Sequence, residues 1–152
     1  MHQSVRAVLI TPTGLVLLMK VAGQTGDPWI TPGGRIRPGE DPTAALVREI
    51  REETERDGLV VGTEIWVRHG TYLADGHRLQ ERERFFLMMT DQFEPSIAAM
   101  EPAELKRHRG FRWWSIPEIA RSLEFFVPRR LAGLLTNLQQ SGPPAHPIES
   151  GE

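Results

Sequence analysis

Short apolar runs, rich in β-branched residues, are separated along the chain by polar segments that contain glycine or proline. Residues 5–10 and 15–21 are the first two such runs, and Thr11-Pro12-Thr13-Gly14 between them is typical of a turn. We therefore predict a hairpin of two strands at the start of the chain. Further extended segments are predicted at residues 29–31, 59–67, 84–89 and 111–114.

Helices are predicted where a capping residue precedes a segment without breakers. Asp41 is a good N-cap, Pro42 suits the first helical position, and residues 43–57 contain no breaker. Ser115 is a second N-cap, before a helix over residues 116–123. A last helix is predicted over residues 128–140, where leucines recur at helical spacing.

The length of 152 residues predicts one domain with a core that needs no disulfide. Residues 141–152 are rich in Pro, Gly, Ser and Glu, so we expect a disordered tail after a domain of residues 1–140. No internal repeat is visible in the sequence.

Composition narrows the function. A net charge of −2 gives polynucleotide binding a low prior, and no apolar run approaches the roughly 20 residues that span a bilayer. The first apolar run is interrupted by Arg6 and lacks a cleavage pattern, so we expect a strand there, not a signal peptide, and a cytoplasmic protein. The absence of cysteine leaves oxygen and imidazole as metal ligands.

The predicted helix after Asp41 carries the candidate chemistry. At about 100° per residue, Glu49, Glu52 and Glu53 share one face, and Arg48 is spaced i, i+4 from Glu52. Three carboxylates so close repel one another, and a divalent cation reverses that interaction. Oxygen ligands suit Mg²⁺ or Mn²⁺, which shares its coordination sphere with substrate phosphates.

A plain solvated face is the usual meaning of a helix rich in Glu and Arg. What favours a metal site is the joint spacing with the glycine pair before the helix. Gly33 and Gly34 let the backbone approach the acids, so a main-chain carbonyl there could complete the site.

The spacing Gly34-x5-Glu40-x7-Arg48-Glu49-Ile50-x-Glu52-Glu53 resembles the Nudix box, GX5EX7REUXEEXGU with U aliphatic. The approach Trp29-x-x-Pro32-Gly33-Gly34 is also similar to that of the Nudix hydrolase family (MutT-like). The match fails at its end, because Thr54-Glu55-Arg56 replaces x-Gly-U. We expect a helix about one turn longer, with Gly58 as its left-handed C-cap.

The resemblance implies an α/β fold of the Nudix type, an α/β/α sandwich around a mixed sheet. It also implies Mg²⁺-dependent hydrolysis of a nucleoside diphosphate linked to another group, such as a nucleoside triphosphate, a nucleotide sugar or ADP-ribose. By position, Glu52 and Glu53 would be the principal metal ligands, with the Gly33 carbonyl and Glu49 assisting. Glu49 is also a candidate base, although some members use an acid on a loop outside the box. Arg48 would orient Glu52, and Glu40 would lie at the periphery of the metal.

Other candidates are less specific. We interpret Glu101 and Glu104 as solvated loop acids, with an additional catalytic or metal-binding acid as the alternative. Arg82 and Arg84 alternate with Glu81 and Glu83, so phosphate contacts and an edge charge pair are both open.

Two other functions share the resemblance. One is a catalytically silent nucleotide-binding or regulatory module, which usually loses acids that are all present here. The other is an isoprenoid diphosphate isomerase, for which the chain lacks the cysteine expected as the acid. The sequence leaves open the substrate, the number of metal ions and whether the chain forms a homodimer. We expect substrate specificity to lie in residues 22–28, 70–83 and 91–109. Residues 70–83 are predicted as a hairpin connection or a mobile loop.

Overall fold

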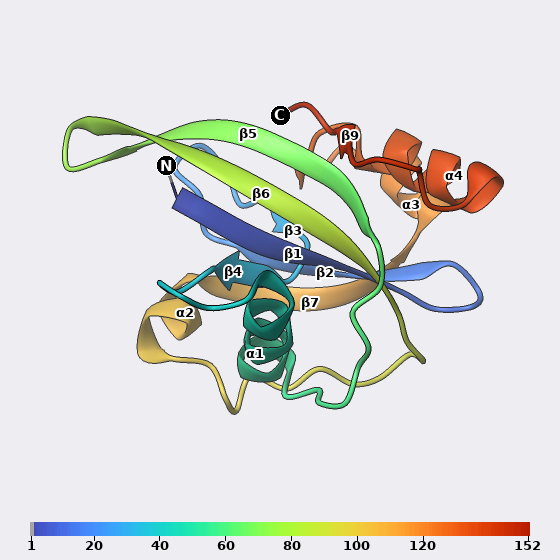
Figure 1. The fold of residues 1–152 in the computed structure, drawn as a ribbon, viewed down its shortest axis with the longest axis horizontal. Coiled ribbons are helices and arrows are strands. Elements are labelled where there is room, and N and C mark those ends of the chain that lie inside the picture. The colour runs from blue at the N-terminus through green and yellow to red at the C-terminus, as the bar shows by residue number, and fades with distance from the viewer. Residues whose placement is uncertain (1) are drawn as a thin grey trace.

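A curled, mixed β-sheet forms the centre of the molecule, and helices cover both of its faces (Figure 1). The computed structural model describes residues 2–152, including the side chains of all of these except residues 72–74. The strands are β1 (His2–Ile10), β2 (Leu15–Val21), β3 (Trp29–Ile30), β4 (Gly33–Arg35), β5 (Glu64–Ala74), β6 (His77–Met89), β7 (His108–Ser115), β8 (Phe126–Val127) and β9 (Ile148–Glu149). The helices are α1 (Pro42–Thr54), α2 (Pro102–Arg107), α3 (Ile116–Arg121) and α4 (Leu131–Ser141).

The main path of the sheet runs β8-β3-β2-β1-β6-β5-β9. β1 lies parallel to β6 and antiparallel to β2, and β4 pairs with the first half of β1 through Ser4, Val5 and Arg6. β7 pairs with β2 away from the main path. This pairing brings the glycine pair of β4 beside the centre of the sheet.

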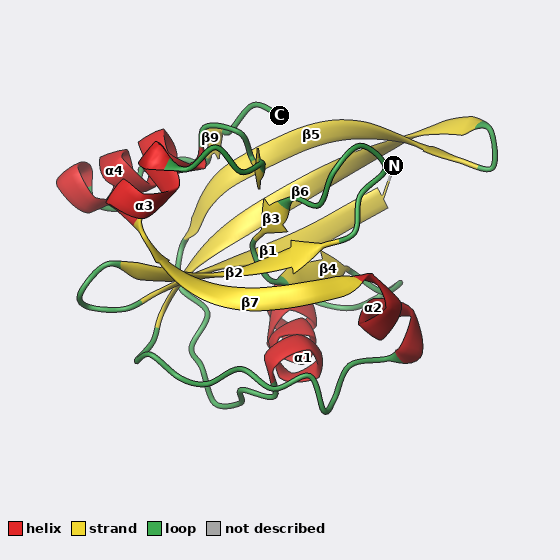
Figure 2. Cartoon of the chain, turned by 180° about the vertical axis from the view of Figure 1, so that it is seen from behind, coloured by secondary structure: helices red, strands yellow, loops and turns green. Residues whose placement is uncertain are grey.

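Alternation along β1 sorts its side chains between two cores. Val5, Ala7 and Leu9 pack with Ala45, Leu46 and Ile50 of α1. Val8 and Ile10 face the opposite side, where the core includes the leucines of α4. Figure 2 shows α1 on one side of the sheet and α3 with α4 on the other. The predicted layers of helix, mixed sheet and helix are therefore confirmed.

Most predicted elements are present. The first hairpin forms, Asp41 caps α1 with Pro42 at the first helical position, and Ser115 caps α3 in a capping box with Glu118. The segment 70–83 is largely paired, because β5 and β6 extend to a turn at Asp75-Gly76. The prediction for residues 59–67 was wrong in position, since β5 begins only at Glu64.

The prediction of a longer α1 was wrong. The helix ends at Thr54, and Glu55, with φ of 64°, takes the left-handed conformation at the position where the box has glycine. The chain leaves the helix here because two contacts with a distant segment take over. Ser96 donates its N–H to the carbonyl of Thr54, the last helical residue, and Arg56 pairs with Asp91 at 2.7 Å. Tertiary contacts thus override the absence of a local breaker.

The C-terminal segment lies against β5. Ile148 and Glu149 pair in parallel with Trp66 and Val67, and Ser150 is fully buried. The Arg130 guanidinium donates to the carbonyls of Ser150 and Glu149. The disorder expected for residues 141–152, and the domain boundary at residue 140, stay predictions. Within the described residues, no helix is both long and apolar enough to cross a membrane.

Candidate metal centre

The acids of α1 lie against the glycine pair of β4. Glu49 and Glu53, one helical turn apart, are both buried, and the Gly33 N–H donates to Glu53 Oε1 at 2.7 Å. A Cβ at Gly34 would lie only 2.5 Å from the Glu49 carboxyl carbon, and a Cβ at Gly33 would lie 2.0 Å from the Val5 carbonyl oxygen. Only glycine at both positions allows the helix acids and the sheet to approach so closely.

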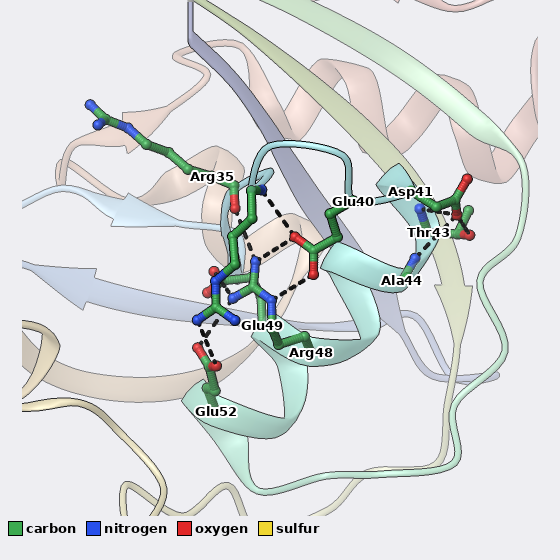
Figure 3. Close-up of polar contacts among 9 residues, drawn as sticks. Arg35, Glu40, Asp41, Thr43, Ala44, Arg48, Glu49 and Glu52 are labelled. Carbon is green, nitrogen blue, oxygen red and sulfur yellow. Dashed lines mark hydrogen bonds and ion pairs between the residues drawn. The ribbon is translucent and has the colours of Figure 1, made fainter.

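Arg48 joins the acids at the start and middle of α1 (Figure 3). Its Nε and Nη2 donate to the two oxygens of Glu40 at 2.8 and 2.9 Å, and its Nη1 donates to Glu49 at 2.9 Å. The bond from Nη1 to Glu52, the partner expected from sequence, is the longest at 3.5 Å. Arg48 lowers the pKa of Glu40 to about 2, so Glu40 serves mainly as the ion-pair partner of Arg48.

A cluster of three carboxylates lies beside this network. Glu49, Glu53 and Glu104 each place a ligand atom within 4.8 Å of the others. Burial raises the pKa of all three carboxyls, most strongly that of Glu53, and repulsion from nearby carboxylates, Glu52 among them, adds to the shift. Oxygen donors that are buried and close together without enough positive charge fit a hard divalent cation.

The other acids considered from the sequence are Glu104, which belongs to this cluster, and Glu52 and Glu101, which lie outside it. Glu104 comes from α2, so the loop acid that we interpreted as solvated is half-buried and faces the α1 acids. Glu52 lies outside the cluster, with Arg37 at 3.8 Å. Glu101 is exposed at the start of α2.

Arg82 and Arg84 alternate with Glu81 and Glu83 along β6. This alternation places the two arginines on one face of the sheet and the two glutamates on the other. Arg84 donates to both oxygens of Glu64, at 3.1 and 2.8 Å, so it pairs with an acid of the neighbouring strand β5 and not with Glu81 or Glu83. Next to the acid cluster lies a cavity that Glu81 lines. Neither Arg82 nor Arg84 is among its described lining residues.

This cavity has a volume of about 550 Å³. The three clustered acids and the glycine pair form one side of it. An apolar wall and cationic groups, which the sequence alone did not single out, form the rest. They are Met19, Val21, Ile30 and Met100 for the wall, and Arg6, Arg35 and Arg107 for the positive charge. Ser4, Glu81 and His108 also line the cavity, and burial lowers the pKa of His108, so its imidazole adds no positive charge at neutral pH. The chain thus offers an acid cluster, nearby positive charge and an apolar surface in one space.

Known proteins share this sequence pattern and fold. The model of one protein family, described as the NUDIX domain, matches residues 1–134. A curated protein of Mycobacterium tuberculosis (strain CDC 1551 / Oshkosh), provisionally named mutator protein MutT4, is 31% identical over 127 residues, covering 78% of this chain and 47% of that protein. The chain therefore spans about half the length of this curated relative.

Solved structures show the same fold at low sequence identity. The E. coli dihydroneopterin triphosphate pyrophosphohydrolase has a TM-score of 0.67 at 17% identity, over 91% of this chain and 96% of that one. A C. elegans Ap4A hydrolase in a binary complex has a TM-score of 0.66 at 16% identity, over 92% and 96%. A MutT NUDIX hydrolase from Burkholderia pseudomallei has a TM-score of 0.61 at 20% identity, over 86% and 94%. The Nudix-type fold expected from the box is thereby confirmed.

Proposed function

The chain belongs to the NUDIX domain family, and from that membership we propose that it hydrolyses the diphosphate linkage of a small-molecule nucleotide with the help of Mg²⁺ or Mn²⁺. The observation that carries the proposal is the cluster of Glu49, Glu53 and Glu104 beside a cavity that also contains cationic side chains. The substrate class is a nucleoside diphosphate joined to a further phosphate, sugar or nucleoside.

We assign the metal-binding roles from the positions of the oxygen donors. Glu49, Glu53 and Glu104 would hold the cation, and the Gly33 carbonyl and Glu52, which the resemblance to the box implies as ligands, would be further donors. When bound, the cation neutralises diphosphate charge and lowers the pKa of a coordinated water. Burial raises the pKa of Glu53, so this residue holds its proton more tightly than an exposed acid until a cation offsets the desolvation.

The chain's other groups position the reactants. Arg48 fixes the carboxylate of Glu49 through a 2.9 Å hydrogen bond and leaves its second oxygen for another partner. Glu49, Glu53 and Glu104 all line the cavity. Glu49 and Glu104 are our two candidates for accepting the proton of the attacking water, because burial favours the protonated form most strongly in Glu53. Arg35 and Arg107 line the same space and contribute positive charge where phosphate oxygens would lie.

A substrate panel tests the proposal. Nucleoside triphosphates, nucleotide sugars, ADP-ribose and dinucleoside polyphosphates are incubated with the full chain, with Mg²⁺, with Mn²⁺ and with chelator. We expect release of a mononucleotide or phosphate from some of them, only with a divalent ion. Metal-dependent binding by calorimetry without turnover on any member would instead identify a silent nucleotide-binding module.

A further inference from the structure

A second cavity adjoins the one that holds the acid cluster. Its volume is about 240 Å³, and it shares five lining residues with the first: Arg6, Val21, Ile30, Glu81 and Arg107. It extends from them to Gly23 and Pro28 in the loop after β2, which the sequence suggested as a specificity segment. A molecule bound at the acid cluster can therefore place an attached group in this second space.

A charge-compensated wall lines the second cavity. Glu83, only 5% exposed, accepts hydrogen bonds from Arg6 Nε and Arg68 Nη1, both at 2.7 Å. Burial alone would raise the pKa of Glu83, but the two arginines outweigh it and lower the pKa. Arg6 and Arg68 share the Glu83 carboxylate, and the Glu81 carboxylate on the same wall offsets the charge that remains. Among the described lining residues only Arg107, at the junction with the first cavity, adds a further positive charge, so this wall attracts a further phosphate little. An uncharged polar group fits it better.

Glu81 lies at the junction of the two cavities. Its Oε1 accepts a hydrogen bond from the Ser4 hydroxyl at 2.5 Å, and within the described residues its Oε2 accepts no hydrogen bond. A carboxylate accepts hydrogen bonds and donates none, so its complement in a ligand is a hydroxyl or amino group. Acidic side chains bind ribose hydroxyls in this way in dinucleotide-binding proteins.

We infer that the two cavities form one groove, in which Glu81 accepts hydrogen bonds from the hydroxyl groups of a sugar ring joined to the diphosphate. The inference rests on the proposed function, because it takes the diphosphate to lie at the acid cluster. The ring is either the ribose of the nucleoside or a sugar on the far phosphate, since both present the same neighbouring hydroxyls.

Binding of α,β-methylene diphosphates tests this inference without turnover, because a CH₂ group replaces the bridging oxygen. Calorimetry with Mg²⁺ compares the ribonucleoside analogues of four bases, their 2′-deoxy counterparts and their sugar esters. We expect at least one base for which the 2′-hydroxyl or the distal sugar increases affinity about tenfold or more. A 2′-deoxy penalty identifies the ribose, and a gain from the ester identifies the distal sugar.

Glu81→Gln should reduce that discrimination to below about threefold, and Glu81→Asp, which withdraws the carboxylate by one methylene, to an intermediate value. The matched control Glu94→Gln changes an exposed acid outside both cavities and should retain it. Equal affinity of all analogues for the wild-type chain, or discrimination that survives Glu81→Gln, overturns the inference. Hydroxyl-dependent binding without hydrolysis of the natural nucleotides leaves this groove standing and rejects the proposed function.

Discussion

Gly34 sets the distance between the Glu49 carboxylate and the backbone of β4. A Cβ at this position would lie 2.5 to 2.7 Å from the carboxyl atoms of Glu49, so any other residue type would displace that carboxylate. Glu49 in turn lies within the acid cluster and accepts a hydrogen bond from Arg48. A small displacement at this one position therefore changes the geometry of the whole candidate site.

Gly34→Ala should lower kcat at least tenfold, because the added methyl group pushes the Glu49 carboxylate out of the cluster. The matched control is Gly133→Ala in α4, where an added Cβ meets nothing within 4 Å and alanine favours the helix. Steady-state kinetics on the best substrate of the panel measures both variants. Wild-type kcat in Gly34→Ala would show that the position of Glu49 does not matter.

Glu83→Gln tests the buried ion pairs through their pH dependence. The arginines lower the pKa of Glu83 in the folded state below its unfolded value of about 4.3. The ionised carboxylate therefore stabilises the fold above about pH 4.3, and this contribution is lost as the pH falls through the folded pKa. We expect Glu83→Gln to lower the free energy of unfolding by about 3 kcal/mol at pH 7, because two partly buried guanidinium groups lose their counter-charge. The difference in free energy of unfolding between the variant and the wild type should shrink as the pH falls from about 5 to about 3, because Glu has a pKa of about 4.3 in the unfolded chain.

Urea titrations at several pH values give these free energies, with Glu94→Gln as the exposed control. A destabilisation that stays constant from about pH 7 to about pH 3 would contradict the ion-pair account, because this range includes the unfolded pKa of about 4.3.

Helix α1 shows what local sequence encodes and what it does not. Its start is local: the Asp41 carboxylate accepts the N–H groups of Thr43 and Ala44, as capping patterns predict. The grouping of its acids on one face is also local, since it follows from helical spacing. Its end is not, because contacts with residues 91 and 96 stop the helix at Thr54.

Glu55→Gly should raise the free energy of unfolding by about 1 kcal/mol. Glu55 has φ of 64°, a conformation that costs a side chain about 1–2 kcal/mol and glycine little. Thermal and urea unfolding measure the change, and kcat should stay within twofold because Glu55 is exposed beyond the clustered acids. A lower stability of Glu55→Gly would mean that the side chain stabilises this helix end.

At the scale of the whole molecule, the sequence predicted the class of fold but not the cavity. The box predicted the layers and the α1 acids because its spacing acts within one helix and one turn. Glu104 joins the cluster only through the placement of α2, and Glu81 meets the cavity only through the pairing of β6 with β1. Contacts between segments so far apart leave no periodic signal in a single sequence.

Removal of residues 143–152 separates the two accounts of the C-terminal segment. The contacts of Arg130 with the carbonyls of Ser150 and Glu149 predict a loss of about 1–3 kcal/mol in the free energy of unfolding. The composition of the tail predicts no change, since a disordered segment contributes no packing. Urea unfolding of the truncated and full chains, with limited proteolysis of the full chain, decides between them.

The most direct test of the central claim is kcat of Glu53→Gln with Mg²⁺ on the best substrate of the panel. Loss of a clustered acid should lower kcat at least about 100-fold. The metal-free variant should be as stable as the wild type or more so, because the amide removes a buried group whose ionisation burial disfavours. Glu94→Gln should keep the wild-type rate. A kcat within threefold of wild type in Glu53→Gln would contradict the assignment of this cluster as the catalytic metal site.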